Sequence, residues 1–182
     1  MVAESYEFDP VDWVTAGALG EPGARTFYIQ ARRGGELISL VLEKGQVASL
    51  SQLAQQLLAR VNVAVVPDDL DVSAQRLVEP AEPAWRVGEL SLGMDEEGTR
   101  FALEASELPM VEDLQPEDAP GLDEPAVARL YMDRAQLVAL AAYAVFAVEA
   151  GARERCRLCS RPIDPVAGHV CPGTNGHGPL SR

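Results

Sequence analysis

Apolar runs with the spacing of strands, followed by one run with the spacing of a helix, organise residues 13–62. Trp13–Gly20 has the pattern of an extended chain, and Thr26–Arg32 places every second apolar side chain on one face, as in a half-buried strand. Glu36–Leu42 is nearly continuous in apolar residues, which predicts a strand buried on both faces. Val47–Val61 repeats its apolar residues at helical spacing, so this part of the chain predicts strand, strand, strand, helix.

The same order of elements is predicted for residues 85–152. Three further strands are expected at Trp85–Leu92, Arg100–Ala105 and Val127–Met132. The apolar run that follows predicts a second helix that begins near Arg134. This run is too short to span a bilayer, so we expect a buried core helix and no membrane partner.

Matching residues indicate that the two halves are copies of one unit. Leu42–Leu50 and Met132–Leu140 agree in chemical type at nearly every position, and each contains a glutamine, Gln46 and Gln136, at the same place. The sequence therefore predicts an α+β fold of two βββα repeats with a pseudo-two-fold relation, followed by a C-terminal zinc knuckle or ribbon.

Two polar segments separate the predicted elements. Residues 66–84 are rich in proline and acidic residues and are expected to link the two copies. Ser106–Glu124 contains seven acids and no base, which predicts a solvated loop inserted into the second copy. We accordingly divide the chain into a duplicated domain, residues 1–152, and a zinc-binding tail, residues 153–182.

All three cysteines and both histidines of the chain lie in its last 27 residues. Thiolate and imidazole groups are the ligands that Zn²⁺ prefers, four of them in a tetrahedron. The spacing of a Cys-x-x-Cys pair and a later His-x-Cys pair predicts a zinc site formed by Cys156, Cys159, His169 and Cys171. Four protein ligands leave no position for water, so the expected role of the zinc is structural.

The fourth ligand is open between two histidines. His177 could replace His169, but the glycine and proline residues around His177 are typical of a fraying chain end, and we favour His169. The Cys-x-x-Cys pair could instead be a redox pair, or the cysteines could be unrelated thiols. An odd number of cysteines argues against a secreted disulfide scaffold, so the cytoplasm is the expected compartment.

Charge is distributed unevenly along the chain, which carries −13 in total. Residues 153–182 contain five arginines and two acids, a net charge of +3, so the first 152 residues carry −16. An acidic body repels phosphate backbones, which argues against nucleic acid as its partner. Because the tail contains five arginines, nucleic acid is a minor alternative partner for that segment.

Two polar positions recur at the starts of both predicted helices. Gln46 and Gln136 could line a cleft between the copies, or they could satisfy backbone groups at the helix starts, which we favour. Glu43 and Asp133 stand at the strand-to-helix junctions, where a carboxylate either complements the helix dipole or, if buried, acts as a general acid.

No catalytic residue is assigned from the sequence, because the body contains neither histidine nor cysteine. The favoured interpretation is a non-catalytic, zinc-containing binding or adaptor protein whose partner is an unknown protein or small molecule. The alternative is a carboxylate-dependent, hydrolase-like enzyme with a site between the two repeats.

The matched blocks around Gln46 and Gln136, the acidic insertion and the tail together resemble a known family. The tail pattern is Cys156-x-x-Cys159 followed by Gly168-His169-x-Cys171-Pro172. This pattern resembles an uncharacterised actinobacterial family of repeat proteins, a domain of unknown function. The resemblance covers essentially the whole chain and is most specific in the tail. It implies a cytoplasmic protein and carries no assigned activity.

Overall fold

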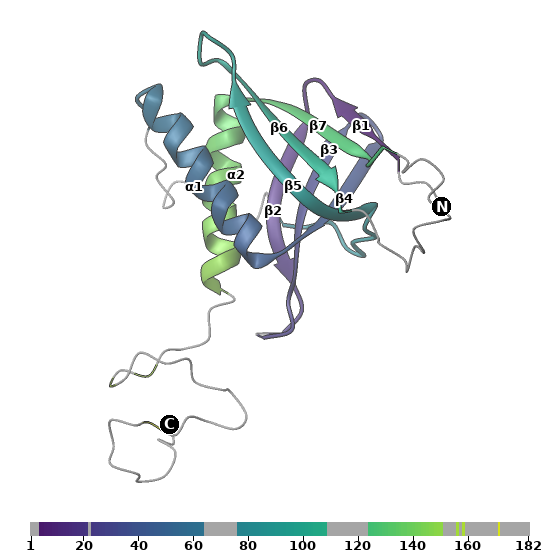
Figure 1. The fold of residues 1–182 in the computed structure, drawn as a ribbon, viewed down its shortest axis with the longest axis vertical. Coiled ribbons are helices and arrows are strands. Elements are labelled where there is room, and N and C mark those ends of the chain that lie inside the picture. The colour runs from purple at the N-terminus through teal and green to yellow at the C-terminus, as the bar shows by residue number, and fades with distance from the viewer. Residues whose placement is uncertain are drawn as a thin grey trace, which may run out of the picture.

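The computed structural model describes four stretches of chain and three residues of the tail, namely residues 4–21, 23–63, 76–108 and 124–150 with Cys156, Leu158 and Cys171. Its elements are, in chain order, β1 (Tyr6–Phe8), β2 (Trp13–Leu19), β3 (Thr26–Arg33), β4 (Glu36–Leu42), α1 (Lys44–Arg60), β5 (Trp85–Met94), β6 (Arg100–Glu107), β7 (Val127–Asp133) and α2 (Arg134–Ala150). The fold is mixed α+β, with both helices on the same side of a curved sheet (Figure 1).

The strands form a seven-stranded sheet in the order β1-β7-β6-β5-β4-β3-β2. Strands β2, β3 and β4 are joined as antiparallel neighbours, and so are β5, β6 and β7. The two groups meet where β4 runs parallel to β5, with Leu40 opposite Trp85 and Val41 opposite Arg86. Each group of three strands is followed by one helix, α1 after β4 and α2 after β7.

The two ends of this strand order are joined through one short stretch of chain. β1 pairs in parallel with β7, and β2 follows after residues 9–12 and pairs with β3. Within this connection the N–H of Val11 donates to the carbonyl of Tyr131 at 2.8 Å, and the N–H of Asp12 donates to the carbonyl of Arg32 at 2.8 Å. Residues 9–12 therefore connect the two ends of the strand order, and their hydrogen bonds place the start of β2 beside the end of β7.

The core lies between the sheet and the two helices, which run antiparallel and pack on each other (Figure 1). Successive strand residues point to opposite faces, so alternate apolar positions of each strand reach this layer. Ile29 stands opposite Leu40, Leu103 stands opposite Leu130, and all four side chains are fully buried. The helices contribute a second set of fully buried leucines, Leu50, Leu58, Leu137 and Leu140.

The six strands and two helices predicted from the apolar pattern are all present, each within about two residues of its expected bounds or longer at one end. Strand β1 was not predicted, because three residues carry no measurable period and their partner lies about 120 positions away in the chain. Among the described residues, no helix is long and apolar enough to cross a membrane.

Two expectations need correction. The strand Glu36–Leu42 is exposed at its first two residues, because Glu36 and Leu37 pair with the exposed Arg33 and Arg32 at the tip of a hairpin, and burial begins only at Ile38. The acidic insertion does not begin at Ser106, since β6 continues to Glu107. The remainder of the insertion from residue 109 to residue 123, and the linker from residue 64 to residue 75, lie outside the described residues.

Candidate functional site

Two of the four predicted zinc ligands belong to the described residues. The side chains of Cys156 and Cys171 are buried, with relative exposures of 2% and 1%, and their sulfur atoms lie 3.6 Å apart. A disulfide would hold the sulfurs at about 2.05 Å, so the two residues face each other without that bond. Cys159, His169 and the alternative ligand His177 lie outside the described residues.

The described residues alone do not contain a complete metal shell. Within them, no group of three or more His, Cys, Asp or Glu side chains comes together. The structure thus brings together one pair of predicted ligands, and this pair comes from the two ends of the tail motif, 15 residues apart.

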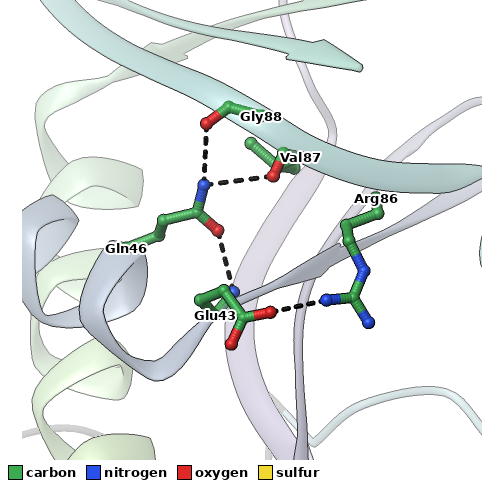
Figure 2. A network of polar contacts seen from close by, with 5 residues as sticks. All are labelled: Glu43, Gln46, Arg86, Val87 and Gly88. Atoms are coloured by element: carbon green, nitrogen blue, oxygen red, sulfur yellow. Dashed lines mark hydrogen bonds and ion pairs between the residues drawn. The ribbon is translucent and has the colours of Figure 1, made fainter. Parts of the chain in front are cut away.

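Gln46, at the start of α1, connects its own helix to the neighbouring group of strands (Figure 2). Its Oε1 accepts a hydrogen bond from the N–H of Glu43 at 2.8 Å. Its Nε2 donates to the carbonyls of Val87 at 3.1 Å and Gly88 at 3.0 Å, both on β5. The register of β5 with β6 shifts at this point, and a Cβ on Gly88 would lie 3.0 Å from the Cα of Leu108. The bulge turns two successive carbonyls toward the glutamine, whose amide satisfies both.

Gln136 makes the matching set of contacts at the start of α2. Its Oε1 accepts from the N–H of Asp133 at 2.9 Å, while its own N–H donates to Oδ1 of Asp133 at 2.8 Å. Its Nε2 donates to the carbonyl of Val11 at 2.9 Å, just before β2. The two glutamines therefore satisfy backbone groups at the helix starts, which is the interpretation favoured from the sequence. In addition, Gln46 binds the start of α1 to β5, and Gln136 binds the start of α2 to the residue just before β2.

The carboxylates considered for catalysis are exposed and lie at separate helix starts. Glu43 forms an ion pair with Arg86 at 2.5 Å, and its side chain is 67% exposed. Asp133 is also exposed and caps α2 through Gln136. A general acid needs a carboxyl whose pKa is raised by burial. The positions of Glu43 and Asp133 therefore favour helix capping over acid–base chemistry.

A hollow of about 340 Å³ lies at the end of β2. We call it the β2 pocket; it is lined by residues 16–19 of β2, by Arg25, by Arg76, Leu77 and Glu79 of the segment before β5, and by Phe146 and Ala147 of α2. A second hollow of about 300 Å³ is lined by Glu89, Leu90, Ser91, Glu104 and Ser106. The second hollow presents carboxylates to solvent, whereas the β2 pocket combines apolar walls with guanidinium groups.

A buried glutamine on β3 fixes one wall of the β2 pocket. Gln30 is fully buried, and its Oε1 accepts from the N–H of Val78 at 2.7 Å while its Nε2 donates to the Val78 carbonyl at 3.0 Å. The same Nε2 donates to Oγ of Ser39 at 2.9 Å. Sequence reasoning missed this contact, because Gln30 falls on the polar side of an alternating strand and the residue that covers it lies 48 positions away.

Three groups whose pKa differs from its ordinary value lie outside the β2 pocket and outside the contacts of Gln46 and Gln136. Hydrogen bonds from the backbone N–H groups of Arg100, and then of Thr99 and Gly98, hold the pKa of Asp95 below the ordinary value for Asp. The hydrogen bond and charge of Glu104 raise the pKa of Arg129. Burial, followed by the charge of Glu4, raises the pKa of Tyr6. None of these three groups lines the β2 pocket.

The fold and its contacts define an α+β domain that is followed by a cysteine-bearing tail. The chain belongs to the DUF3090 family, described as proteins of unknown function, and the match covers residues 6–171. No curated protein and no solved structure matches the chain. The family supplies no activity, so the function has to be argued from the geometry of the molecule.

Proposed function

We propose that the chain is a non-catalytic binding protein whose tail holds one structural Zn²⁺ through Cys156, Cys159, His169 and Cys171. The observation that carries the proposal is the pair of buried sulfurs, 3.6 Å apart. Two thiolates bound to one tetrahedral zinc at about 2.3 Å each would stand about 3.8 Å apart. The distance between Cys156 and Cys171 is close to this value and far from that of a disulfide.

The chemistry of the four proposed ligands supports a structural rather than a catalytic metal. Three thiolates and one imidazole complete a tetrahedron and leave no open position for water. The family match ends at Cys171, so it includes the four proposed ligands and leaves out His177. Thiolates of this kind persist in a reducing compartment, and we therefore place the protein in the cytoplasm.

The proposal includes two βββα repeats related by a pseudo-two-fold axis. It is supported by the repeated order of three strands and a helix, and by the matching contacts of Gln46 and Gln136.

A binding role is supported by the exposure of Glu43 and Asp133, because neither of these two candidate carboxylates is buried as a general acid would be. The partner is a protein or a small molecule rather than nucleic acid, because the body carries a strong negative charge.

The metal is tested by zinc analysis of the full chain, purified without chelator or added metal. We expect about one zinc per chain in the parent protein, and less than about a tenth of that in Cys156→Ser and Cys171→Ser. Leu158→Ser is the matched control, since Leu158 is an exposed residue of the same segment and is not a proposed ligand. This control should retain the metal.

The reactivity of the cysteines gives an independent measurement. Bound thiolates should react with an alkylating reagent only after a strong chelator is added. The zinc site would be overturned if protein purified without chelator contained no zinc and its cysteines reacted at once.

A screen of ester, phosphoester and peptide substrates tests the binding role separately. Turnover that is abolished in the Glu43→Gln, Asp133→Asn double variant, with the fold intact, would replace that role by catalysis.

A further inference from the structure

The β2 pocket lies between two different layers of the protein. Neighbouring residues of a strand point to opposite faces, so Ala16 and Ala18 face one side of β2 while Gly17 and Leu19 face the other. Ala16 is buried toward the core, where Ala147 of α2 is also buried. On the opposite side, Leu77 covers Gly17. The pocket thus spans the free edge of β2, which pairs only with β3 among the described strands.

The wall formed by residues 76–79 is held firmly in place. A Cβ added to Gly17 would lie 2.8 Å from Cγ of Leu77, so the leucine occupies space that only a glycine leaves. The next residue, Val78, is bound at both its N–H and its carbonyl by the fully buried Gln30. A pocket whose wall is fixed before binding loses little conformational entropy when a ligand enters.

The remaining surface of the pocket is apolar and accessible. Phe146 on the last part of α2 is 57% exposed, although it is a large aromatic side chain. Leu19 at the end of β2 is half-buried. An exposed aromatic ring beside a hollow of this size is typical of small-molecule sites, whose volumes begin at about 300 Å³.

Two guanidinium groups give the pocket a positive charge in an otherwise acidic protein. Arg25 is oriented by a hydrogen bond from its Nε to the carbonyl of Gly20 at 3.2 Å, which leaves its terminal nitrogens for other acceptors. In the described part of the chain, neither Arg25 nor Arg76 takes part in an ion pair. Guanidinium groups bind carboxylates in a bidentate manner, more strongly than they bind neutral acceptors.

Glu79 sets a limit on the charge of the ligand. Its carboxylate also lines the pocket, so the lining carries two positive groups and one negative group. With two positive groups and one negative group, the lining has a net charge of one positive unit, which a single negative charge on the ligand balances. A monoanion is therefore the ligand whose charge matches the lining.

From these observations we propose that the β2 pocket binds a small organic monocarboxylate with an apolar or aromatic body. The carboxylate contacts Arg25 and Arg76, and the apolar body lies against Phe146, Leu77 and Leu19. The inference rests on the proposed binding role but not on the zinc, because no lining residue is a proposed metal ligand. Loss of zinc and loss of ligand binding are therefore separate results on the same preparation.

The test is a titration of ¹⁵N-labelled full-length protein with three probes of nearly equal shape. They are naphthalene-2-carboxylate, the neutral naphthalene-2-carboxamide and the cationic 2-naphthylmethylammonium. We expect the carboxylate to shift the amide signals of residues 16–19, Leu77 and Phe146, and to bind at least about tenfold more tightly than the carboxamide. The cation should bind most weakly of the three.

Charge variants assign the preference to the pocket. Arg25→Gln and Arg76→Gln should each reduce the preference for carboxylate over carboxamide while binding of the carboxamide persists. Arg33→Gln is the control, since Arg33 is an exposed arginine of β3 outside the pocket, and it should leave the preference unchanged. Glu79→Gln should strengthen binding of the carboxylate.

Three results would overturn the proposal. The first is the absence of shifts at residues 16–19 at saturating carboxylate, as would occur if another part of the chain filled the pocket. The second is equal affinity for the anion and the cation. The third is a preference for carboxylate that survives in the Arg25→Gln, Arg76→Gln double variant.

Discussion

The side-chain Nε2 of Gln46 lies 3.1 Å from the carbonyl oxygen of Val87, and this contact joins the start of α1 to the first strand of the second group (Figure 2). Because the same nitrogen also reaches the carbonyl of Gly88, one side chain satisfies both acceptors at the bulge of β5. Gln136 makes the corresponding contact with Val11. A glutamine at the start of each helix therefore binds the backbone of the other three-strand group: Gln46 binds β5, and Gln136 binds Val11 just before β2.

Replacing Gln46 by alanine should destabilise the protein by about 1–3 kcal/mol, because the acceptors on β5 and the N–H of Glu43 would lose their partner. The free energy of unfolding is measured by urea denaturation. Gln56→Ala is the control, since Gln56 is an exposed residue of the same helix, and its effect should stay within about 0.5 kcal/mol. Equal effects of the two substitutions would show that the contact with β5 contributes nothing measurable.

The local part of this arrangement could be predicted from the sequence. Glutamine three positions after Glu43 or Asp133 has the spacing of a capping box, and the structure places both glutamines accordingly. The contacts of Gln46 with β5 could not be predicted, since they join residues more than 40 positions apart and depend on a bulge. Local patterns thus placed the helix starts, and tertiary pairing determined what else the glutamines bind.

The candidate pocket was hidden for the same reason. The pattern of β3 places Gln30 on the face opposite Phe27 and Ile29, which is normally the solvent face of a strand. In the structure this face is covered by the segment that contains Val78. A polar residue in the middle of a strand was the only available signal, and it does not identify its cover. The cysteine spacing, by contrast, is local and already specified which tail residues to examine.

Replacing residues 109–123 by a short Gly/Ser linker should change the free energy of unfolding by no more than about 1 kcal/mol, because shortening a loop has a small entropic effect. The ends of the segment are already held together. The N–H of Glu107 donates to the carbonyl of Ala126 at 2.8 Å, and the N–H of Leu108 donates to the carbonyl of Arg86 at 2.7 Å. A loss of several kcal/mol in urea denaturation would show that Met110, Val111 and Leu114 pack into the core.

Asp95 should make stability depend on pH through its contacts at the turn between β5 and β6. Its Oδ1 accepts from the N–H of Thr99 at 2.8 Å, and its pKa is lowered, chiefly by the hydrogen bond from the N–H of Arg100. A carboxyl whose pKa is lower in the folded state than in the unfolded state stabilises the fold above its unfolded pKa. This contribution disappears as the pH falls through the lowered folded value.

We therefore expect Asp95→Asn to unfold at a lower urea concentration than the parent protein near pH 7. The difference between the two urea midpoints should become smaller below about pH 4. Glu96→Gln is the control, because Glu96 is exposed in the same turn and no hydrogen bond of its side chain is among the described contacts. At each pH, the urea midpoint of each variant is compared with that of the parent protein. A difference for Asp95→Asn that grows on acidification would contradict the assigned direction of the pKa shift.

The fourth zinc ligand can be decided between the two histidines of the tail. If His169 completes the tetrahedron with Cys156, Cys159 and Cys171, His169→Ala should lose most of its zinc, because three thiolates alone leave one position to water and weaken retention. His177→Ala should keep about one zinc per chain, since His177 lies beyond the family match that ends at Cys171. The measurement is zinc content after dialysis against a weak chelator, with circular dichroism to show that the α+β body is unchanged in both variants. Retention of zinc in His169→Ala together with loss in His177→Ala would move the fourth ligand to His177 and leave the three cysteines in place.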